Sequence, residues 1–228
     1  MIILSLDTTT SAGSVALMRH DRVVREQASD ASRPQAARLP GELMALLEAE
    51  HLSLRDIDGF AVGIGPGSFT GLRVGIATMQ GLAVAMDRPL FGVSALDALA
   101  TRAGGGPAER VTTWVDAWRG EVYAALYERG REVQPPIVAP PHTLLRAVVG
   151  TLTFTGDGAL LHRDVISTAL GHRARFTEPI SPLLAGVMAT LAADAYTAGQ
   201  RPPPHAIRAL YVRRPDAELA RDAGRTGA

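Results

Sequence analysis

The sequence predicts an α/β protein made of two structurally related lobes. Apolar runs of strand length alternate with segments in which apolar residues have helical spacing, the pattern of a sheet flanked by helices. The run 111–116 repeats the pattern of the first run, 2–7, and the segments that follow the two runs match without a gap. Glycines and a proline at 104–107 separate the two copies. With 228 residues, the chain is long enough for one large domain or two small ones.

The first copy opens with three short strands. The apolar run 2–6 ends at Asp7, and apolar runs at 14–18 and 23–25 follow it across a polar turn, which predicts a meander. A helical segment comes next, and its apolar side consists of Ala36, Leu39, Leu43, Leu46 and Leu47. Because Pro40 lies inside this segment, it should bend the helix or mark its start.

A glycine-rich stretch at 62–73 organises the rest of the chain. It follows an apolar strand at 57–64 and precedes a helix that reaches about Met86. Glycines at 63, 65, 67 and 71 allow positive φ values and close approach of another group. Ser68 or Thr70 can cap the helix, and the free N–H groups of the loop would suit an anion. Two interpretations stay open, a phosphate cradle or a structural corner.

The helix after this stretch is apolar on two sides. One stripe consists of Leu72, Ile76, Met79, Ala83 and Met86, and the second of Val74, Ala77, Gly81 and Val84. A helix that is apolar on two sides is buried on two sides. One side can cover its own sheet, and the other needs a neighbour unless the helix is internal to one large core.

The remaining segments complete two copies of one pattern. Residues 89–93 predict a strand, and Ser94 can cap a helix that reaches about residue 103. In the second copy the interval from Asp116 to Leu126 equals that from Asp7 to Leu17. We therefore expect an N-terminal lobe at 1–103, a C-terminal lobe at 104–214 and a flexible tail at 215–228.

The end of the second copy is predicted in less detail. A proline-rich turn is expected at 135–141, a helix near 142–149 and a strand at 152–155. The glycines at 156 and 158 open a further helix. Ser181 and Pro182 have the residue types of a helix N-cap and first helical position, so the last helix is expected from there to about residue 198.

Composition excludes several kinds of chemistry. The formal net charge is zero with basic and acidic residues interspersed, which argues against tight RNA binding by this chain alone. There is no cysteine and no lysine, which excludes thiol catalysis, thiolate zinc sites, a P-loop lysine and a Schiff base. No leader or long apolar span is evident, and the expected location is the cytoplasm, without a membrane.

The possible catalytic and ligand-binding residues are few. Asp7 and Asp116 could hold a metal ion and phosphate between two lobes, or they could be turn formers that bond their own backbone. The glycine spacing fits a dinucleotide loop poorly, and Ser68 lacks the flanking glycines of a nucleophile elbow. The six histidines show no metal-ligand spacing. We expect no catalytic residue, no cofactor and no metal site.

Several motifs resemble the TsaB (YeaZ) family. They are the opening strand with Asp7, Thr8 and Thr9, the run 63–73, and the segments 92–96, 115–123, 156–158 and 211–213. The resemblance implies a duplicated actin-like fold (ASKHA, RNase H-like) with two lobes of mixed sheet and flanking helices. It also implies a non-catalytic dimerisation subunit in the bacterial machinery for tRNA threonylcarbamoyladenosine (t6A). The implied partners are the catalytic subunit TsaD and the ATPase TsaE, with tRNA reached only through the complex and a homodimer formed by the chain alone.

Two sets of residues follow from this reading. Family members dimerise through the helices that flank the glycine run, so the expected partner interface is Leu39, Leu43, Leu47, Leu72, Ile76, Met79 and Ala83. A degenerate phosphate loop would consist of Asp7, Thr8, Thr9, Gly65, Gly67, Ser68 and Thr70. The alternative function is an actin-like ATP-dependent phosphotransferase that uses Asp7 and the loop 8–10. A peptidase has no support, because thiol, zinc spacing and a recognisable Ser-His-Asp set are all missing from the sequence.

Overall fold

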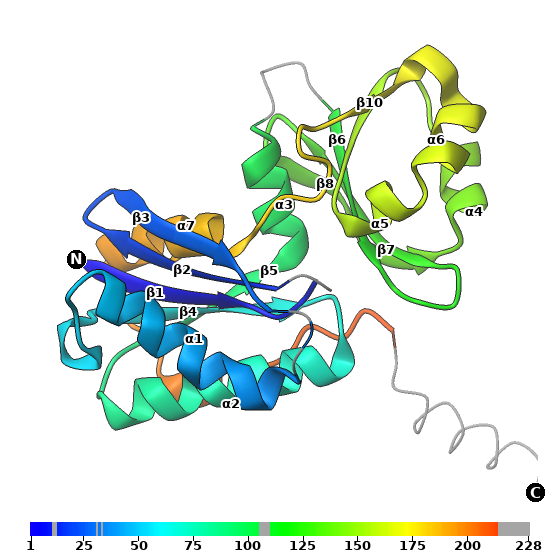
Figure 1. Cartoon of the computed structure of the whole chain (residues 1–228). Coiled ribbons are helices and arrows are strands. Elements are labelled where there is room, and N and C mark those ends of the chain that lie inside the picture. Colours follow the sequence, from blue (N-terminus) through cyan, green and yellow to red (C-terminus); the bar gives the residue numbers. More distant parts are fainter. Residues whose placement is uncertain (11–12, 31, 33, 105–109, 214–228) are drawn as a thin grey trace, which may run out of the picture.

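The computed structural model describes residues 1–10, 13–30, 32, 34–104 and 110–213. Figure 1 shows two sheets, each with its own helices. The strands are β1 (Ile2–Asp7), β2 (Ser14–Arg19), β3 (Arg22–Ala28), β4 (Gly59–Gly65), β5 (Leu90–Ser94), β6 (Arg110–Asp116), β7 (Val122–Glu128), β8 (Arg131–Ala139), β9 (Leu152–Thr155) and β10 (Ala174–Phe176). The α-helices are α1 (Gln35–Ala49), α2 (Phe69–Ala85), α3 (Ala95–Ala103), α4 (Pro141–Arg146), α5 (Asp157–Leu161), α6 (Arg163–Leu170) and α7 (Ala185–Thr197). Short 3-10 turns lie at η1 (Leu54–Asp56), η2 (Gly171–Arg173) and η3 (Pro204–Ala206).

The two sheets have the same topology, which confirms the predicted duplication. The first has the strand order β3-β2-β1-β4-β5, and the second, read in the same direction, β8-β7-β6-β9-β10. In each sheet the central strand ends in an aspartate and pairs antiparallel with the next strand of the chain. It pairs parallel with the fourth strand on its other side.

The N-terminal sheet is covered on both faces. On one face α1 and α2 lie side by side over an apolar core that includes Leu4, Leu17, Leu43, Phe60 and Met79. On the other face lies α7, whose alanines pack against the sheet. Figure 1 shows this helix, drawn in orange, beside the blue strands of the first sheet. The C-terminal part of the chain therefore completes the N-terminal lobe. A division of the chain at residue 104 assigns each sheet to one half, but α7, from the second half, packs on the sheet of the first.

The C-terminal sheet is also covered on two sides. Helix α3 packs on β6 and shares a core with α7. The other face carries α4, α5 and α6 around Trp114 and Phe154, whose rings meet edge to face with centroids 5.3 Å apart. Residues from both halves of the chain thus join the two lobes.

Three predicted boundaries differ from the structure. The proline-rich segment expected as a turn is instead part of β8, because β8 is an edge strand and its pairing with β7 is irregular at the two prolines. Helix α1 runs from Gln35 through Pro40 without a new start. Helix α7 begins at Ala185, so Ser181 is not its N-cap. The segments at 163–170 and 174–176, for which the sequence makes no separate prediction, form α6 and β10.

Other predictions lie partly outside the described residues. They concern most of the glycine break, at 105–107, and the tail at 215–228. Among the described residues, no helix is long and apolar enough to span a membrane.

Candidate functional site

Asp7 ends β1 with a fully buried carboxylate. Its Oδ1 accepts hydrogen bonds from the backbone N–H of Thr9 (2.8 Å) and from the Thr9 hydroxyl (2.6 Å), and its Oδ2 accepts one from the Thr10 hydroxyl (3.0 Å). Burial raises the pKa of Asp7 above its ordinary value, although these hydrogen bonds favour the ionised form. Both oxygens of Asp7 are therefore engaged within its own turn, the behaviour of a turn-forming aspartate.

The glycine run packs directly against this turn. A Cβ atom on Gly67 would lie 2.2 Å from the carbonyl oxygen of Thr9, and one on Gly71 would lie 2.4 Å from that of Thr8. The backbone N–H of Ser68 donates to the Thr9 carbonyl at 3.1 Å. Because any side chain at the two glycine positions would overlap this backbone, the glycines allow two loops to touch. These contacts favour the structural corner over the phosphate cradle.

The other predicted phosphate residues lie around the same corner. The hydroxyl of Ser68 accepts the N–H of Gly71 at 3.2 Å, which confirms the predicted cap of α2. Thr70 is exposed in the first turn of that helix. Gly65 has a φ of 108° and lies against the chain near Leu210. The corner thus brings the turn 7–9 and the glycine run into direct contact with each other, while Gly65 lies against the segment at Leu210.

The Asp7 corner has a counterpart in the second lobe that is more open. Asp116 is half-buried at the end of β6, and its Oδ1 accepts the N–H of Trp118 at 2.8 Å. The backbone N–H of Asp116 donates to Oδ1 of Asp157 at 3.0 Å, at the start of α5. A Cβ atom on Gly156 would lie 2.1 Å from the carbonyl oxygen of Trp114, so here too a glycine permits backbone contact. The side chain of Trp118 is exposed.

The predicted partner interface lies on the sides of α1 and α2 that the monomer itself buries. All seven residues are buried in the core of the monomer, because their stripes face the sheet and each other: Leu39, Leu43, Leu47, Leu72, Ile76, Met79 and Ala83. The second stripe of α2 is the one that solvent reaches. Ala77 and Gly81 are exposed, and Val84 is 66% exposed.

The neighbouring surface of α1 has a similar character. Pro40, Gly41, Met44 and Ala45 are exposed along that helix, and Met44 is 39% exposed. Together the two helices present a face of small and apolar residues, which we call the α1–α2 face: Ala37, Pro40, Gly41, Met44 and Ala45 on α1, and Val74, Ala77, Gly81 and Val84 on α2.

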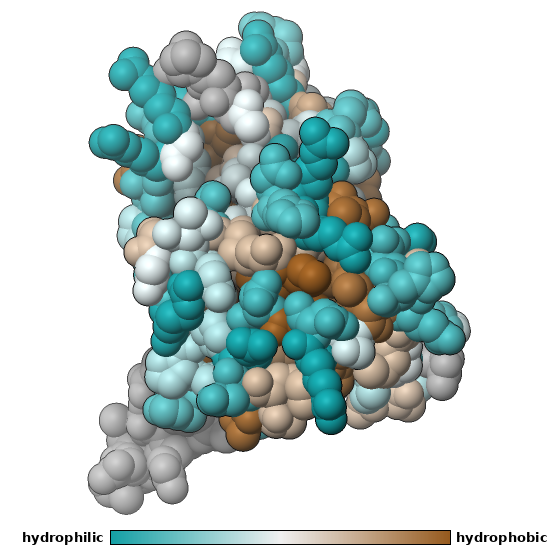
Figure 2. Space-filling view, turned by 90° about the vertical axis from the view of Figure 1, so that its left-hand side faces the viewer, coloured by the Kyte–Doolittle hydropathy of each residue, from teal (hydrophilic) through white to brown (hydrophobic). Residues whose placement is uncertain are grey.

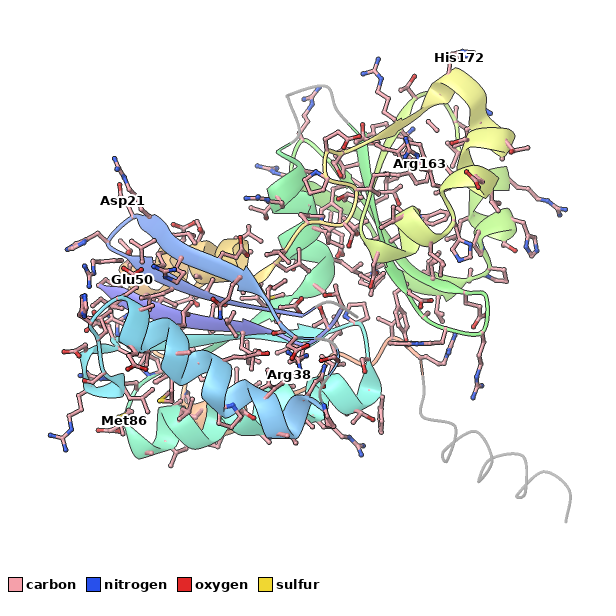
Figure 3. The ribbon with its side chains drawn as sticks, in the orientation of Figure 1. Asp21, Arg38, Glu50, Met86, Arg163 and His172 are labelled. Atoms are coloured by element: carbon pink, nitrogen blue, oxygen red, sulfur yellow. The ribbon has the colours of Figure 1, made fainter. Side chains whose placement is uncertain are left out.

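A shallow groove lies at one end of these two helices. Met44, Leu52 and Met86 are among the residues that line it. Figure 3 labels Met86 at this end of the N-terminal lobe. Figure 2 views the molecule from that side and shows apolar surface in patches between hydrophilic side chains.

Two polar contacts that hold the lobes together were not predicted from the sequence. Ser14 on β2 accepts the N–H of Ala185 through its hydroxyl at 3.0 Å. Glu26 on β3 accepts the N–H of Gly186 through Oε1 at 2.6 Å. These side chains satisfy the first N–H groups of α7, and a carboxylate at a helix N-terminus is favourable. Because Ser14 and Glu26 lie far from α7 in the sequence, no local sequence pattern predicts these contacts.

A nearly buried ion pair fixes the start of α1. Arg38 is 3% exposed and donates to Glu42 at 2.9 Å, one turn later; Figure 3 labels Arg38 near this end of the helix. Burial acts to raise the pKa of Glu42, but hydrogen bonds from Asp30, Ser29 and Arg38 outweigh it and hold the pKa below its ordinary value. In the sequence, only the spacing of four residues, which places the two side chains on the same side of a helix, indicates this ion pair.

No group of three or more histidine, aspartate or glutamate side chains in the described parts of the chain could hold a metal ion.

Comparison with known proteins now gives the family. The family model described as "TsaD: tRNA N6-adenosine threonylcarbamoyltransferase" matches residues 23–220. The tRNA threonylcarbamoyladenosine biosynthesis protein TsaB of Bacillus subtilis is 30% identical over 178 residues, 75% of this chain and 77% of that protein. The chain belongs to the TsaB (YeaZ) family.

Two further relatives match over different lengths. TsaB of Escherichia coli is 42% identical over 130 residues, 57% of this chain and 56% of that protein. An uncharacterized protein of Mycobacterium leprae is 36% identical over 222 residues, 95% of this chain, and the match likewise spans 56% of that protein. The chain thus spans little more than half the length of these two relatives.

Solved structures confirm the actin-like fold of this TsaB family member. A Pseudomonas aeruginosa structure described as similar to the peptidase YeaZ has a TM-score of 0.76 at 32% identity, over 93% of this chain and 99% of that chain. The activator of 2-hydroxyisocaproyl-CoA dehydratase from Clostridium difficile, with bound ADPNP, has a TM-score of 0.56 at 10% identity, over 88% of this chain and 98% of that chain. The second likeness shows the fold alone.

Proposed function

We propose that this TsaB family member is a non-catalytic subunit required for t6A modification of tRNA, and that it acts by binding a TsaD-like catalytic subunit through its α1–α2 face. The observation that carries the proposal is the contrast between the Asp7 corner and the exposed side of α2. The corner where an actin-like enzyme would need an open loop is occupied by Thr8, Thr9 and the glycine run. The helix beside it leaves apolar surface uncovered.

The state of Asp7 supports a non-catalytic role. A carboxylate that is to bind Mg²⁺ needs an oxygen free to coordinate it. Both oxygens of Asp7 accept hydrogen bonds within its own turn, and burial raises its pKa. Thr9 uses both lone pairs of Oδ1, so only Oδ2 keeps a lone pair for a metal ion, and Asp7 is fully buried.

The composition of the α1–α2 face supports partner binding. Small residues such as Ala77 and Gly81 allow a partner helix to approach closely, and Met44 and Val84 can contribute apolar area. Apolar surface collected on one face of a soluble protein is typical of an interaction site. We expect this face to pair with a second copy when the chain is alone and with the catalytic subunit in the complex.

The further partners are proposals of the same kind. A TsaE-like ATPase joins the pair, tRNA is reached only through the assembled complex, and the location is the cytoplasm. The peptidase named for the Pseudomonas relative is not favoured, because the sequence has no cysteine and the described residues contain no cluster that could hold a catalytic metal ion.

An omission experiment tests the proposal. The chain, the catalytic subunit, the ATPase and a supply of threonylcarbamoyl-adenylate are combined with unmodified tRNA, each protein is left out in turn, and t6A is measured by mass spectrometry. We expect no t6A from this chain alone and t6A only when the chain is added to the others. Transfer by the chain alone, or full transfer without it, would overturn the scaffold role.

Calorimetry with Mg-ATP tests the alternative phosphotransferase. Without lysine, phosphate affinity would rest on backbone donors and arginine, and the chain itself fills the corner. We expect binding weaker than about 10 μM, which corresponds to about −7 kcal/mol. Tighter binding that Asp7→Asn abolishes would favour the phosphotransferase.

A further inference from the structure

Three aromatic side chains of the described chain are well exposed, and two of them are in contact with each other. Phe69 is 44% exposed, Tyr211 43% and Trp118 46%, whereas the other aromatic residues are buried or half-buried. Phe69 begins α2 directly after the glycine run, and Trp118 lies in the hairpin after β6. Phe69 therefore follows β4 in the first sheet, and Trp118 follows the central strand of the second sheet.

Phe69 and Tyr211 are held in a defined arrangement by an arginine. Their ring centroids are 5.6 Å apart. The guanidinium of Arg73 lies 3.8 Å from the centroid of Phe69, and its Nε donates to the Tyr211 hydroxyl at 3.3 Å. An exposed guanidinium stacked on a ring and fixed by a hydrogen bond loses little freedom when a ligand binds.

A short segment connects this arrangement to Trp118. The N–H of Leu210 donates to the carbonyl of Ile64 at 2.7 Å, which fixes the segment at the end of β4. Three residues later, Arg213 donates to the carbonyl of Ala117 at 3.0 Å and also bonds Glu121. Because Trp118 directly follows Ala117, the segment 210–213 brings the hairpin of one lobe close to the aromatic residues of the other.

We propose that unpaired bases of single-stranded RNA stack on a site formed by Phe69, Arg73, Tyr211 and Trp118. We call these four residues the stacking site. The inference rests on the proposed function, because a subunit of a complex that modifies a tRNA loop meets unpaired nucleotides. Proteins recognise such nucleotides by stacking them on aromatic rings and guanidinium planes. Because the chain has no lysine, every basic side chain here is a planar guanidinium.

The neutral charge of the chain sets the expected affinity. Phosphate contacts supply most of the salt-dependent affinity of RNA-binding proteins, and this chain has no excess of basic residues. Stacking of bases on aromatic rings depends less on salt than phosphate binding does. The isolated chain should therefore bind RNA weakly, with a small salt dependence, and should contribute an auxiliary contact within the complex.

Fluorescence anisotropy tests the stacking site with a fluorescein-labelled, unstructured RNA of seven nucleotides, using the chain alone and assembled with the catalytic subunit. Arg73→Lys keeps the charge but removes the planar stack, and Tyr211→Ala removes a ring. Arg88→Lys is the matched control, because Arg88 is exposed at the other end of α2. We expect each of the first two variants to weaken binding about tenfold and the control to leave it unchanged.

Four outcomes would overturn the inference. They are no RNA binding by the wild-type chain in either form, equal loss in Arg73→Lys and Arg88→Lys, equal binding of a duplex of the same length, and equal binding of free AMP. Loss of catalytic-subunit binding in Arg73→Lys, with RNA binding intact, would instead make the region a protein interface. The omission experiment for t6A fails or succeeds separately, so a failure of the proposed function can be told apart from a failure of this site.

Discussion

The two sides of α2 differ in what they touch, although both are apolar. The inner side carries Leu72, Ile76 and Met79 into the core, and Gly71 lies directly on the turn after β1. The outer side exposes Ala77 and Val84 to solvent. The inner side has its neighbour within the lobe, whereas no described residue covers Ala77 or Val84 on the outer side. One helix thus serves the fold on one side and is available for a partner on the other.

A pair of buried charges should produce the largest difference between the two sides. Replacing Ile76 and Met79 by arginine places two charges in the core, and each unpaired buried charge costs several kcal/mol. Since a domain is stable by about 5–15 kcal/mol in total, we expect the double variant not to fold. Circular dichroism measures the outcome.

The control for this experiment is Ala77→Arg with Val84→Arg. It introduces the same charges on the outer side of the same helix, and it should keep the stability within about 0.5 kcal/mol of the wild type. A folded inner-side variant would show that α2 does not pack as described.

Adding a single methyl group to each side of α2 should give the second largest difference in stability. In Gly71→Ala the added Cβ would lie 2.4 Å from the carbonyl oxygen of Thr8, so the backbone must shift, at a cost of about 3 kcal/mol. Gly81→Ala meets nothing within 4 Å and should stabilise the helix by about 1 kcal/mol. Urea denaturation of both variants checks these signs. Equal effects would remove the contrast between the two sides.

The turn after β1, which contains Asp7 and lies against the inner side of α2, should make the stability depend on pH, with a smaller effect. The folded-state pKa of Asp7 is raised by burial above the ordinary value of 3.8. Between these two pKa values the folded chain binds more protons than the unfolded chain, so the contribution of Asp7 to stability falls as pH rises through that window. Asp7→Asn, which does not titrate, should cost about 1–2 kcal/mol at pH 4 through altered hydrogen bonding, and less at pH 8. Urea denaturation at several pH values measures this difference. A cost that does not change with pH would contradict the burial of Asp7.

Sequence predicted the fold of this chain better than its surfaces. The repeat from Asp7 and Asp116 predicted two equivalent sheets because strand order follows from local patterns and short connections. The cap by Ser68 was likewise local. The start of α7 could not be predicted, since Ser14 and Glu26 bind it from the other end of the chain.

The candidate site shows why surfaces are harder to predict. Periodicity found both stripes of α2 but could not say which one faces the sheet, because both are apolar and the choice depends on how Gly71 and Gly75 seat the helix on Thr8. The region around Phe69 and Tyr211 depends on a contact between residues far apart in the sequence. Such contacts leave no pattern in a single sequence.

Binding between this chain and the catalytic subunit tests the central claim most directly. Analytical ultracentrifugation of the Ala77→Arg, Val84→Arg variant with the TsaD-like subunit, beside a control variant with arginine at the exposed Val23 and Val24 of β3, measures whether the outer side of α2 is the interface. The account predicts that the α2 variant remains folded, loses the heterodimer by at least about 100-fold in affinity and yields no t6A in the full mixture, while the control behaves as wild type. A folded α2 variant that still forms the heterodimer with wild-type affinity would contradict the account.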